Sequence, residues 1–394
     1  MTSPPCPACG GTDLHVFHEV DGVPVNSCLL VAERGEALSF PRGDLRLAWC
    51  GGCGFITNTA FDAGRSTYSQ DYEETQGFSP RFRDFISDLS RRWVSRYDLA
   101  GKHVVEIGCG KGEFLVELTR AGVGSGVGVD PGVKPSRVPD DVRDRLTWVQ
   151  GFFPDDHPVL EADAVVCRHT LEHIRPVGDF MRTIRSAIGH RRDTAVLFEL
   201  PGTMHVLQNA WFWDTYYEHC SYFTAGSLAR LFRTSGFEVL DLWPAYDGQY
   251  VVCEARPADV PAPDSTRPVE ESVEQIAAGA RQFAAEYQAT VDHWRDRIRA
   301  VAADGVRPVI WGSGSKGVAF LTALGEDAEA VQAAVDINPF KHGRWMAGTG
   351  HRIVAPKELV DLQPGLVIAM NETYLTEIGR DLADLGVETT LEAV

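Results

Sequence analysis

The sequence predicts an α/β protein whose central domain is a doubly wound, mostly parallel sheet, with a smaller lobe before it and another behind it. Between residues 80 and 255, apolar runs alternate with helix-length segments, which is typical of βαβ units. Residues 1–60 are instead rich in glycine, proline and cysteine. Four prolines at residues 256–268 predict a linker, and a second, shorter alternation follows it.

Each strand is predicted from one of these apolar runs, and each helix from a helix-length segment. The central domain is expected to hold strands at residues 103–107, 126–129, 164–167 and 195–198. After the linker we expect a long helix at about residues 269–303 and strands at 309–311, 333–336 and 366–369. The chain should therefore divide into residues 1–65, 66–256 and 257–394.

Composition limits the possible partners. The 394 residues include 44% hydrophobic and 23% charged residues, the balance of a soluble globular protein. A formal net charge of −18 argues against a nucleic-acid partner. The first six residues lack a basic stretch followed by an apolar run, and no segment offers ~20 consecutive apolar residues. We therefore expect a cytoplasmic protein without a membrane partner, whose nine cysteines stay reduced.

Four of those cysteines form two Cys-x-x-Cys knuckles, each followed by glycine: Cys6, Cys9, Cys50 and Cys53. Two intervening residues let both thiolates of a pair reach one tetrahedral ion. Because protein supplies all four ligands, we predict a structural zinc ion without a catalytic role. Cys28 lies between the knuckles without a matching partner, so it is expected in the core or in a cleft.

A glycine-rich turn follows the first strand of the central domain, at residues 106–112. Glycine permits a sharp turn and lets a ligand approach the start of a helix. Asp130 lies at the end of the next strand, twenty residues beyond Gly110, where a carboxylate can accept both ribose hydroxyls. These features predict a nucleoside or dinucleotide site.

The turn resembles the first motif of class I methyltransferases, E/D-x-G-x-G-x-G, and residues 167–174 are similar to the fourth motif of that family. The resemblance implies S-adenosylmethionine as cofactor. It also implies that an aromatic pair after the third strand flanks adenine. The cofactor-binding residues carried over are Glu106, Gly108, Gly110, Gly112, Asp130, Phe152, Phe153 and His169. A nicotinamide-dependent reductase is the competing use of such a fold, but its Tyr-x-x-x-Lys element has no counterpart here.

Residues 213–223 concentrate three phenols, the base His219 and an acid able to orient it, Glu218. Methyl transfer to carbon needs a group that removes a proton next to a carbonyl and another that stabilises the oxyanion. Histidine and tyrosine suit these tasks near neutral pH. An aromatic loop that only covers the cofactor is the structural alternative.

At residues 216–223 the chain resembles the sugar C-methyltransferases, whose segment reads Y-x-E-H-x-S-Y-F and which join a zinc lobe, a class I core and a C-terminal lobe. The resemblance implies that His219 is the general base. Tyr216 and Glu218 would then position the substrate and stabilise an enolate, and Tyr222 would contact the substrate.

The C-terminal lobe resembles that family at the glycine turn of residues 311–317 and at the D-x-x-P-x-K-x-G element of residues 336–343. Glycine turns at a helix start can bind phosphate through backbone amides. The implied contacts to an anionic, nucleotide-linked substrate are Lys316, Lys341, Arg344 and Asn371. Solvated loops are the structural alternative for these turns.

The sequence thus predicts an S-adenosylmethionine-dependent C-methyltransferase that acts on a nucleotide-linked ketosugar. An O- or N-methyltransferase acting on another natural-product intermediate remains an alternative, and a non-catalytic binding module is a third. Tyr72 and Ser79 lie where related chains cover the cofactor.

Overall fold

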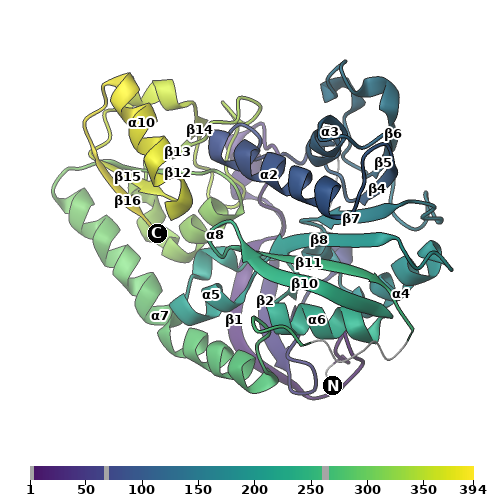
Figure 1. Cartoon of the computed structure of the whole chain (residues 1–394). Helices are drawn as coiled ribbons and strands as arrows, with labels where there is room; N and C mark the ends of the chain where they lie inside the picture. Colours follow the sequence, from purple (N-terminus) through teal and green to yellow (C-terminus); the bar gives the residue numbers. More distant parts are fainter. Residues whose placement is uncertain (1–3, 66–70, 260–265) are drawn as a thin grey trace.

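The computed structural model of the chain describes residues 4–65, 71–259 and 266–394, and the strands of these residues form three sheets (Figure 1). Residues 1–3, residues 66–70 beside the first predicted boundary, and residues 260–265 of the predicted linker lie outside the described residues.

The central sheet has the strand order β10-β11-β8-β7-β4-β5-β6. Strands β4 to β8 run parallel, while β10 and β11 form an antiparallel hairpin that pairs with β8. The strands are β4 (His103–Ile107), β5 (Ser125–Val129), β6 (Leu146–Val149), β7 (Ala164–Arg168), β8 (Ala195–Pro201), β10 (Phe237–Ala245) and β11 (Tyr250–Pro257). This doubly wound sheet confirms the predicted fold class and places a switch in strand order at β4 and β7.

Helices cover both faces of this sheet. One face packs against α2 (Pro80–Arg96) and α3 (Glu113–Arg120), and the other against α4 (Val177–Ile188) and α6 (Ala225–Thr234). Helix α2 begins where Ser79 accepts a hydrogen bond from the Phe82 amide at 3.2 Å and a proline occupies the first turn. Apolar residues at helical spacing then face the sheet.

The N-terminal lobe is an antiparallel sheet of the order β1-β2-β3-β9. Strands β1 (Leu14–Pro24), β2 (Arg42–Cys50) and β3 (Ile56–Asn58) come from the lobe itself, as does the short helix α1 (Arg34–Leu38). Strand β9 (Ser221–Tyr222) comes instead from the central part of the chain, and Ser221 pairs with Thr57. The segment that carries the predicted catalytic residues is therefore held by the N-terminal lobe.

The C-terminal lobe holds a parallel sheet of the order β14-β13-β12-β15-β16. Its strands are β12 (Pro308–Trp311), β13 (Ala334–Val335), β14 (Ile353–Val354), β15 (Leu366–Ala369) and β16 (Thr390–Ala393). Its own helices are α8 (Ser315–Leu324), α9 (Leu359–Leu362) and α10 (Leu375–Leu385). All three strand runs predicted for this lobe are present.

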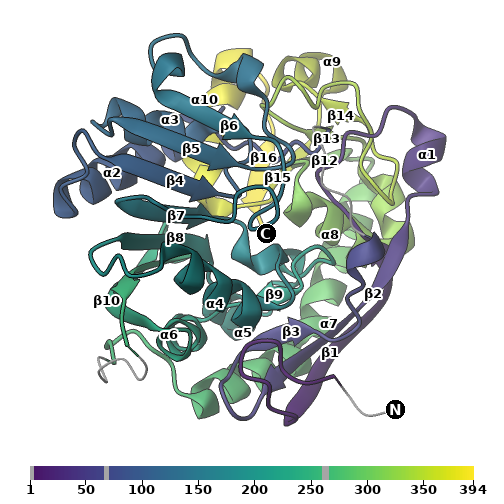
Figure 2. The same ribbon diagram turned by 90° about the vertical axis from the view of Figure 1, so that its right-hand side faces the viewer.

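The long helix α7 (Val273–Ala303) joins the lobes along one side of the molecule (Figures 1 and 2). Its first half packs against β1, where Phe283 meets the rings of Phe17 and His18, and against α5 (Met204–Asn209). It begins at Val273, four residues later than predicted, because Ser272 and Gln275 form a capping box.

Within the described residues, no helix combines the length and the apolar character that a membrane crossing requires.

Candidate active site

A cavity of about 1000 Å³ lies at the carboxyl ends of the central parallel strands, between the central sheet and the C-terminal lobe. Its wall combines the glycine turn after β4, the ends of β5, β7 and β8, the segment before β9, and turns of the C-terminal lobe. Open α/β sheets bind their ligands at this edge.

The glycine turn needs its glycines. Gly108, Gly110 and Gly112 have φ values of +70°, +53° and +86°, which side chains other than glycine rarely adopt. A Cβ atom at Gly108 would lie 2.0 Å from Thr170, and one at Gly112 would lie 2.4 Å from the ring of Trp148. The turn therefore leaves bare backbone facing the cavity, ahead of α3.

Two carboxyl groups lie beside this turn. Asp130 follows β5, and its carboxylate accepts hydrogen bonds from the amides of Gly110 at 3.0 Å and Gly132 at 2.6 Å. Glu106, within β4, is buried, and this burial raises the pKa of its carboxyl group to about 8. Burial likewise raises the pKa of Asp130. Asp130 thus fixes the turn and still faces the cavity.

The aromatic pair after β6 lines the same cavity, with two different environments. Phe152 is 55% exposed, whereas Phe153 is buried and meets Phe180 edge to face, with ring centroids 5.8 Å apart. Phe152 is therefore free to stack on a planar group. Phe153 also belongs to the core.

His169 follows β7 with φ +45° and lines the cavity. Its ring forms an ion pair with the buried carboxylate of Glu199 at 3.0 Å and meets Tyr250 edge to face. Burial lowers the pKa of His169, but the charges of Glu199 and Glu172 outweigh it and raise the pKa to about 9. This wall of the cavity therefore carries a buried cation.

His219 is 7% exposed and lies in the cavity wall among other rings. The ring centroids of Tyr216 and His173 are 4.2 and 4.8 Å from that of His219. Burial lowers the pKa of His219 well below 6.5, and the charges of His173 and His169 act in the same direction. The imidazole is consequently neutral at pH 7, as a proton acceptor must be.

Burial also raises the pKa of the Tyr216 phenol well above its usual value, so this hydroxyl stays protonated. Tyr222 bridges the loop: its hydroxyl accepts from the Tyr216 amide at 3.2 Å and donates to the Tyr216 carbonyl at 3.1 Å. Both side chains line the cavity next to His219.

Glu218 is buried and its carboxylate points toward the N-terminal lobe rather than toward the imidazole of His219. It accepts hydrogen bonds from Asn26 at 3.2 Å, from the Ser27 amide at 3.2 Å and from the Tyr72 hydroxyl at 2.9 Å. The Glu218 carbonyl oxygen lies 3.0 Å from Nδ1 of His173. Sequence reasoning did not single out Asn26 and Ser27 as partners of Glu218, because nothing local marks residues that meet across 192 and 191 positions of chain.

The predicted substrate contacts of the C-terminal lobe separate into two groups. Lys316, Lys341 and Asn371 line the cavity, whereas Arg344 is absent from the described lining. Each lysine has a carboxylate partner: Lys316 pairs with Asp214 at 2.9 Å and Lys341 with Asp336 at 3.2 Å.

Asn371 exchanges hydrogen bonds with Gln249, on the turn between β10 and β11, at 2.8 and 2.9 Å. The side-chain oxygen Oε1 of Gln249 also accepts a hydrogen bond from Lys316 Nζ at 3.3 Å. Gln249 was not predicted, and a lone glutamine in a turn gives no sequence signal.

Two further residues from the sequence analysis line this cavity. Ser79 caps α2 and donates to Glu377 of α10 at 2.8 Å, and both line the cavity. The Cys28 thiol also lines it, 3.7 Å from the Ser315 hydroxyl.

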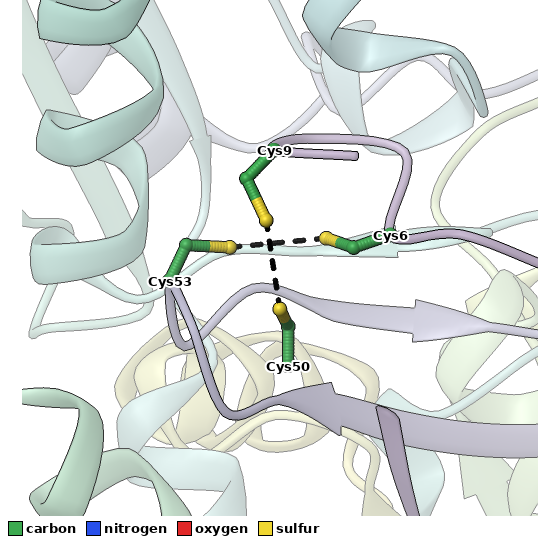
Figure 3. Close-up of side chains that lie close together, drawn as sticks. All are labelled: Cys6, Cys9, Cys50 and Cys53. Carbon is green, nitrogen blue, oxygen red and sulfur yellow. Dashed lines mark hydrogen bonds between the residues drawn. The ribbon is translucent and has the colours of Figure 1, made fainter. Parts of the chain in front are cut away.

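The four knuckle cysteines meet at one point away from the cavity (Figure 3). The sulfurs of Cys6 and Cys53 are 3.8 Å apart and those of Cys9 and Cys50 are 3.6 Å apart. Thiolates bound tetrahedrally at ~2.3 Å from one ion would lie roughly 3.8 Å from each other. The residues therefore fit a tetrahedral metal ion that prefers sulfur ligands.

Comparison with known proteins identifies two domains in the chain. Residues 76–242 match a methyltransferase domain, and residues 267–389 match a C-methyltransferase C-terminal domain. The C-methyltransferase NovU of Streptomyces niveus is 29% identical over 226 residues, which are 55% of this chain and 53% of NovU. The chain thus spans about half the length of this curated relative.

Two solved structures are similar over part of the chain. The N,N-8-amino-8-demethyl-D-riboflavin dimethyltransferase of Streptomyces davawensis is 23% identical, with a TM-score of 0.38, over 45% of this chain and 54% of its own. The magnesium protoporphyrin IX methyltransferase of Synechocystis PCC 6803 is 14% identical, with a TM-score of 0.37, over 48% of this chain and 91% of its own.

The sheet order and the first matched domain define the class of the protein: it is built as a methyltransferase. The second matched domain narrows this class. Along this chain, a match to a C-methyltransferase C-terminal domain follows the match to a methyltransferase domain, an order that accounts for residues 76–242 and 267–389.

Proposed function

We propose that this chain transfers the methyl group of S-adenosylmethionine to a carbon atom of a nucleotide-linked ketosugar, with His219 as the general base. The observation that carries the proposal is the buried, neutral imidazole of His219 in the cavity wall. A neutral imidazole can accept a proton from a C–H bond that a neighbouring carbonyl acidifies. Methylation of oxygen or nitrogen requires no such carbon acid.

The cofactor is proposed to lie along the glycine turn. S-adenosylmethionine supplies an electrophilic methyl group when it is bound. The bare backbone at Gly108, Gly110 and Gly112 would admit its methionine part, and the Asp130 carboxylate would accept its ribose hydroxyls. Phe152 would stack on adenine. Glu106, Phe153 and His169 would complete the wall of this site.

The proposed reaction begins when His219 takes the proton from the acidic carbon, and the electrons of that C–H bond form an enolate. The enolate carbon then forms the new bond to the methyl group while the methyl–sulfur bond breaks. The Tyr216 phenol, which stays protonated, would donate a hydrogen bond to the enolate oxygen. His219 finally returns its proton to solvent through the cavity.

Glu218 is proposed to act through its neighbours. Its carboxylate accepts from Tyr72 and from the Ser27 amide, and its backbone carbonyl lies beside His173. These contacts hold the 216–222 segment against the N-terminal lobe, so Glu218 is a positioning residue for His219 and Tyr216.

The C-terminal lobe is proposed to bind the nucleotide part of the acceptor through Lys316, Lys341 and Asn371, with Tyr222 next to the sugar. The carboxylate partners of both lysines offset part of their charge. Arg344 is absent from the described lining, so the proposed contacts leave it out. The name of the relative, a C-methyltransferase, supports methylation of carbon, and the ketosugar is the finer part of the proposal.

We also propose that the knuckle cysteines Cys6, Cys9, Cys50 and Cys53 bind one structural zinc ion. The division into residues 1–65, 66–256 and 257–394 is proposed to follow the three sheets, with β9 as the segment that crosses from the second part to the first. The cytoplasmic location stays a prediction.

Solvent deuterium exchange at the acceptor carbon tests the base. With a ketosugar nucleotide in D₂O and S-adenosylhomocysteine in place of the methyl donor, the wild type should exchange the acidic hydrogen without methylation. His219→Asn should lower both this exchange and kcat by ~10²-fold or more. The matched control is His293→Asn on the exposed side of α7, which should change neither. Undiminished exchange in His219→Asn would remove His219 as the base.

Fragmentation of the product by tandem mass spectrometry tests the atom that is methylated. A methyl group that remains on the carbon skeleton supports the proposal. A methyl group lost with oxygen or nitrogen would instead support the alternative O- or N-methyltransferase.

A further inference from the structure

A short segment, residues 71–76, crosses the wall of the cavity and is tied to all three lobes; we call it the strap. The Glu73 amide donates to the Cys28 carbonyl at 2.8 Å. The buried Glu73 carboxylate accepts from Arg137 at 2.9 and 3.1 Å and from Asn338 of the C-terminal lobe at 3.1 Å. The backbone of the strap is therefore fixed from both sides.

Because Glu73 is fixed by contacts that lead away from the cavity, its neighbour Glu74 points into the cavity. The Glu74 carboxylate lies directly over the glycine turn: a Cβ atom at Gly110 would come within 2.8 Å of Oε1. Its other oxygen, Oε2, is buried and accepts no hydrogen bond from the described residues. The nearest cation to Oε2 is Lys111 Nζ at 3.7 Å, and this ammonium donates to the Gly132 carbonyl at 3.0 Å.

The surroundings of Glu74 leave its negative charge poorly compensated. Burial raises the pKa of the Glu74 carboxyl group to about 7; Lys111 acts against this shift, whereas Asp130 and Glu73 add to it. Near neutral pH, Glu74 is therefore present partly as the carboxylate and partly as the acid. The groups that face it are Lys111 and Cys109 of the turn, Asp130 after β5, Glu73 of the strap and Cys28 of the N-terminal lobe.

We propose that Glu74 is the counter-charge for the cationic part of the cofactor, a sulfonium or an ammonium group that lies over Gly110. This inference rests on the proposed function, because it takes S-adenosylmethionine as the ligand of the glycine turn. A cation brought next to the buried Oε2 supplies a closer counter-charge than Lys111, whose ammonium lies 3.7 Å away. The cation favours the ionised form, so cofactor binding releases a proton and becomes tighter as the pH rises through about 7.

Isothermal titration calorimetry of the full chain tests the proposal. Glu74→Gln keeps the size of the side chain and removes its charge. Hydrogen bonds to charged groups contribute ~1.5–3 kcal/mol, which corresponds to a ~10–150-fold increase in the Kd for S-adenosylmethionine. The control is Glu388→Gln, an exposed carboxylate outside the cavity lining, and the Kd of this variant should stay unchanged.

S-adenosylhomocysteine distinguishes the two cations, because it keeps the ammonium and lacks the sulfonium. Equal weakening of both ligands by Glu74→Gln assigns the contact to the ammonium. Weakening of S-adenosylmethionine alone assigns it to the sulfonium.

Titrations at pH 7 in buffers of different ionisation enthalpy measure the protons released on binding. The wild type should release a fraction of a proton per cofactor, and Glu74→Gln should release less. If Glu74 has only a structural role, wild type and Glu74→Gln should release the same number of protons on binding. Glu74→Asp keeps the charge on a shorter side chain and should recover part of the affinity and of the proton release.

Unchanged affinity and proton release in Glu74→Gln would overturn the role of Glu74. If Glu74→Gln does not fold, a wild-type affinity independent of pH between 6 and 8 would overturn it as well. A wild type that does not bind S-adenosylmethionine contradicts the proposed function itself. Failure of the Glu74 proposal and failure of the proposed function therefore give different results.

Discussion

Replacing Glu199 by glutamine removes a carboxylate that compensates two buried cations beneath the cavity. Glu199 lies in β8 with 0% exposure, and its carboxylate contacts Arg168 Nε and, at 3.0 Å, Nε2 of His169. Burial raises the pKa of Glu199, but the charges of Arg168 and His169 outweigh it and hold the pKa at about 2. The substitution therefore leaves the Arg168 guanidinium buried without this counter-ion.

Two arguments give the size of the expected loss in the free energy of unfolding. A pKa of about 2 instead of the usual value of 4.5 corresponds to roughly 3 kcal/mol in the free energy of unfolding. Removing one partner of a buried ion pair generally costs ~3–5 kcal/mol. At ~2–4 °C per kcal/mol for a domain of this size, the melting temperature of Glu199→Gln should fall by roughly 6–20 °C.

Thermal unfolding followed by near-ultraviolet circular dichroism at pH 7 measures this difference, with the exposed Glu161→Gln as a control that should shift little. A pH series adds a second criterion. Because the pKa of His169 is raised to about 9, its pairing stabilises the folded state fully below pH 6.5 and is lost as the pH rises through about 9. The difference between wild type and variant should therefore narrow between about pH 7 and pH 9.5, while the Arg168 part persists.

A shift below ~2 °C, or one of the same size at every pH, would refute the reasoning that this cluster is held by charge compensation.

Three further predictions concern the metal site and the glycine turn. Cys50→Ser should lose about one equivalent of zinc, measured by inductively coupled plasma mass spectrometry, because three thiolates remain; full zinc content would contradict the four-cysteine site. Arg230 donates to the Cys53 carbonyl at 2.8 Å, so its charge lies beside the thiolates. Arg230→Met should release zinc to a chelator several-fold faster, and an unchanged rate would show that this charge is not needed. Gly112→Ala places a Cβ atom 2.4 Å from Trp148 at φ +86°. At a strain of ~1–3 kcal/mol, it should weaken S-adenosylmethionine binding by calorimetry at least ~5-fold, and wild-type affinity would argue against the turn as the cofactor site.

Local patterns determined the fold class and the position of the main motifs. The strands β4, β5, β7 and β8 were predictable because a buried parallel strand reads as a continuous apolar run, whatever its neighbours are. The two cysteine knuckles and the glycine turn were predictable for a similar reason, since ligand spacing and positive φ are imposed within a few residues. The 216–223 segment was found through its resemblance to a family.

Only the tertiary structure decided how these parts meet. The pairing of Ser221 with Thr57 joins two distant parts of the chain, and the hydrogen bonds of Glu218 with Asn26 and Ser27 span 192 and 191 positions. The pairing of Lys316 with Asp214 likewise spans 102 positions. Such contacts depend on which surfaces the folded lobes bring together, and a side chain carries no mark of its distant partner. For this reason the sequence singled out His219 and the glycine turn as candidates, whereas the direction of Glu218 and the place of Glu74 over Gly110 came from the packing of the three lobes around the cavity.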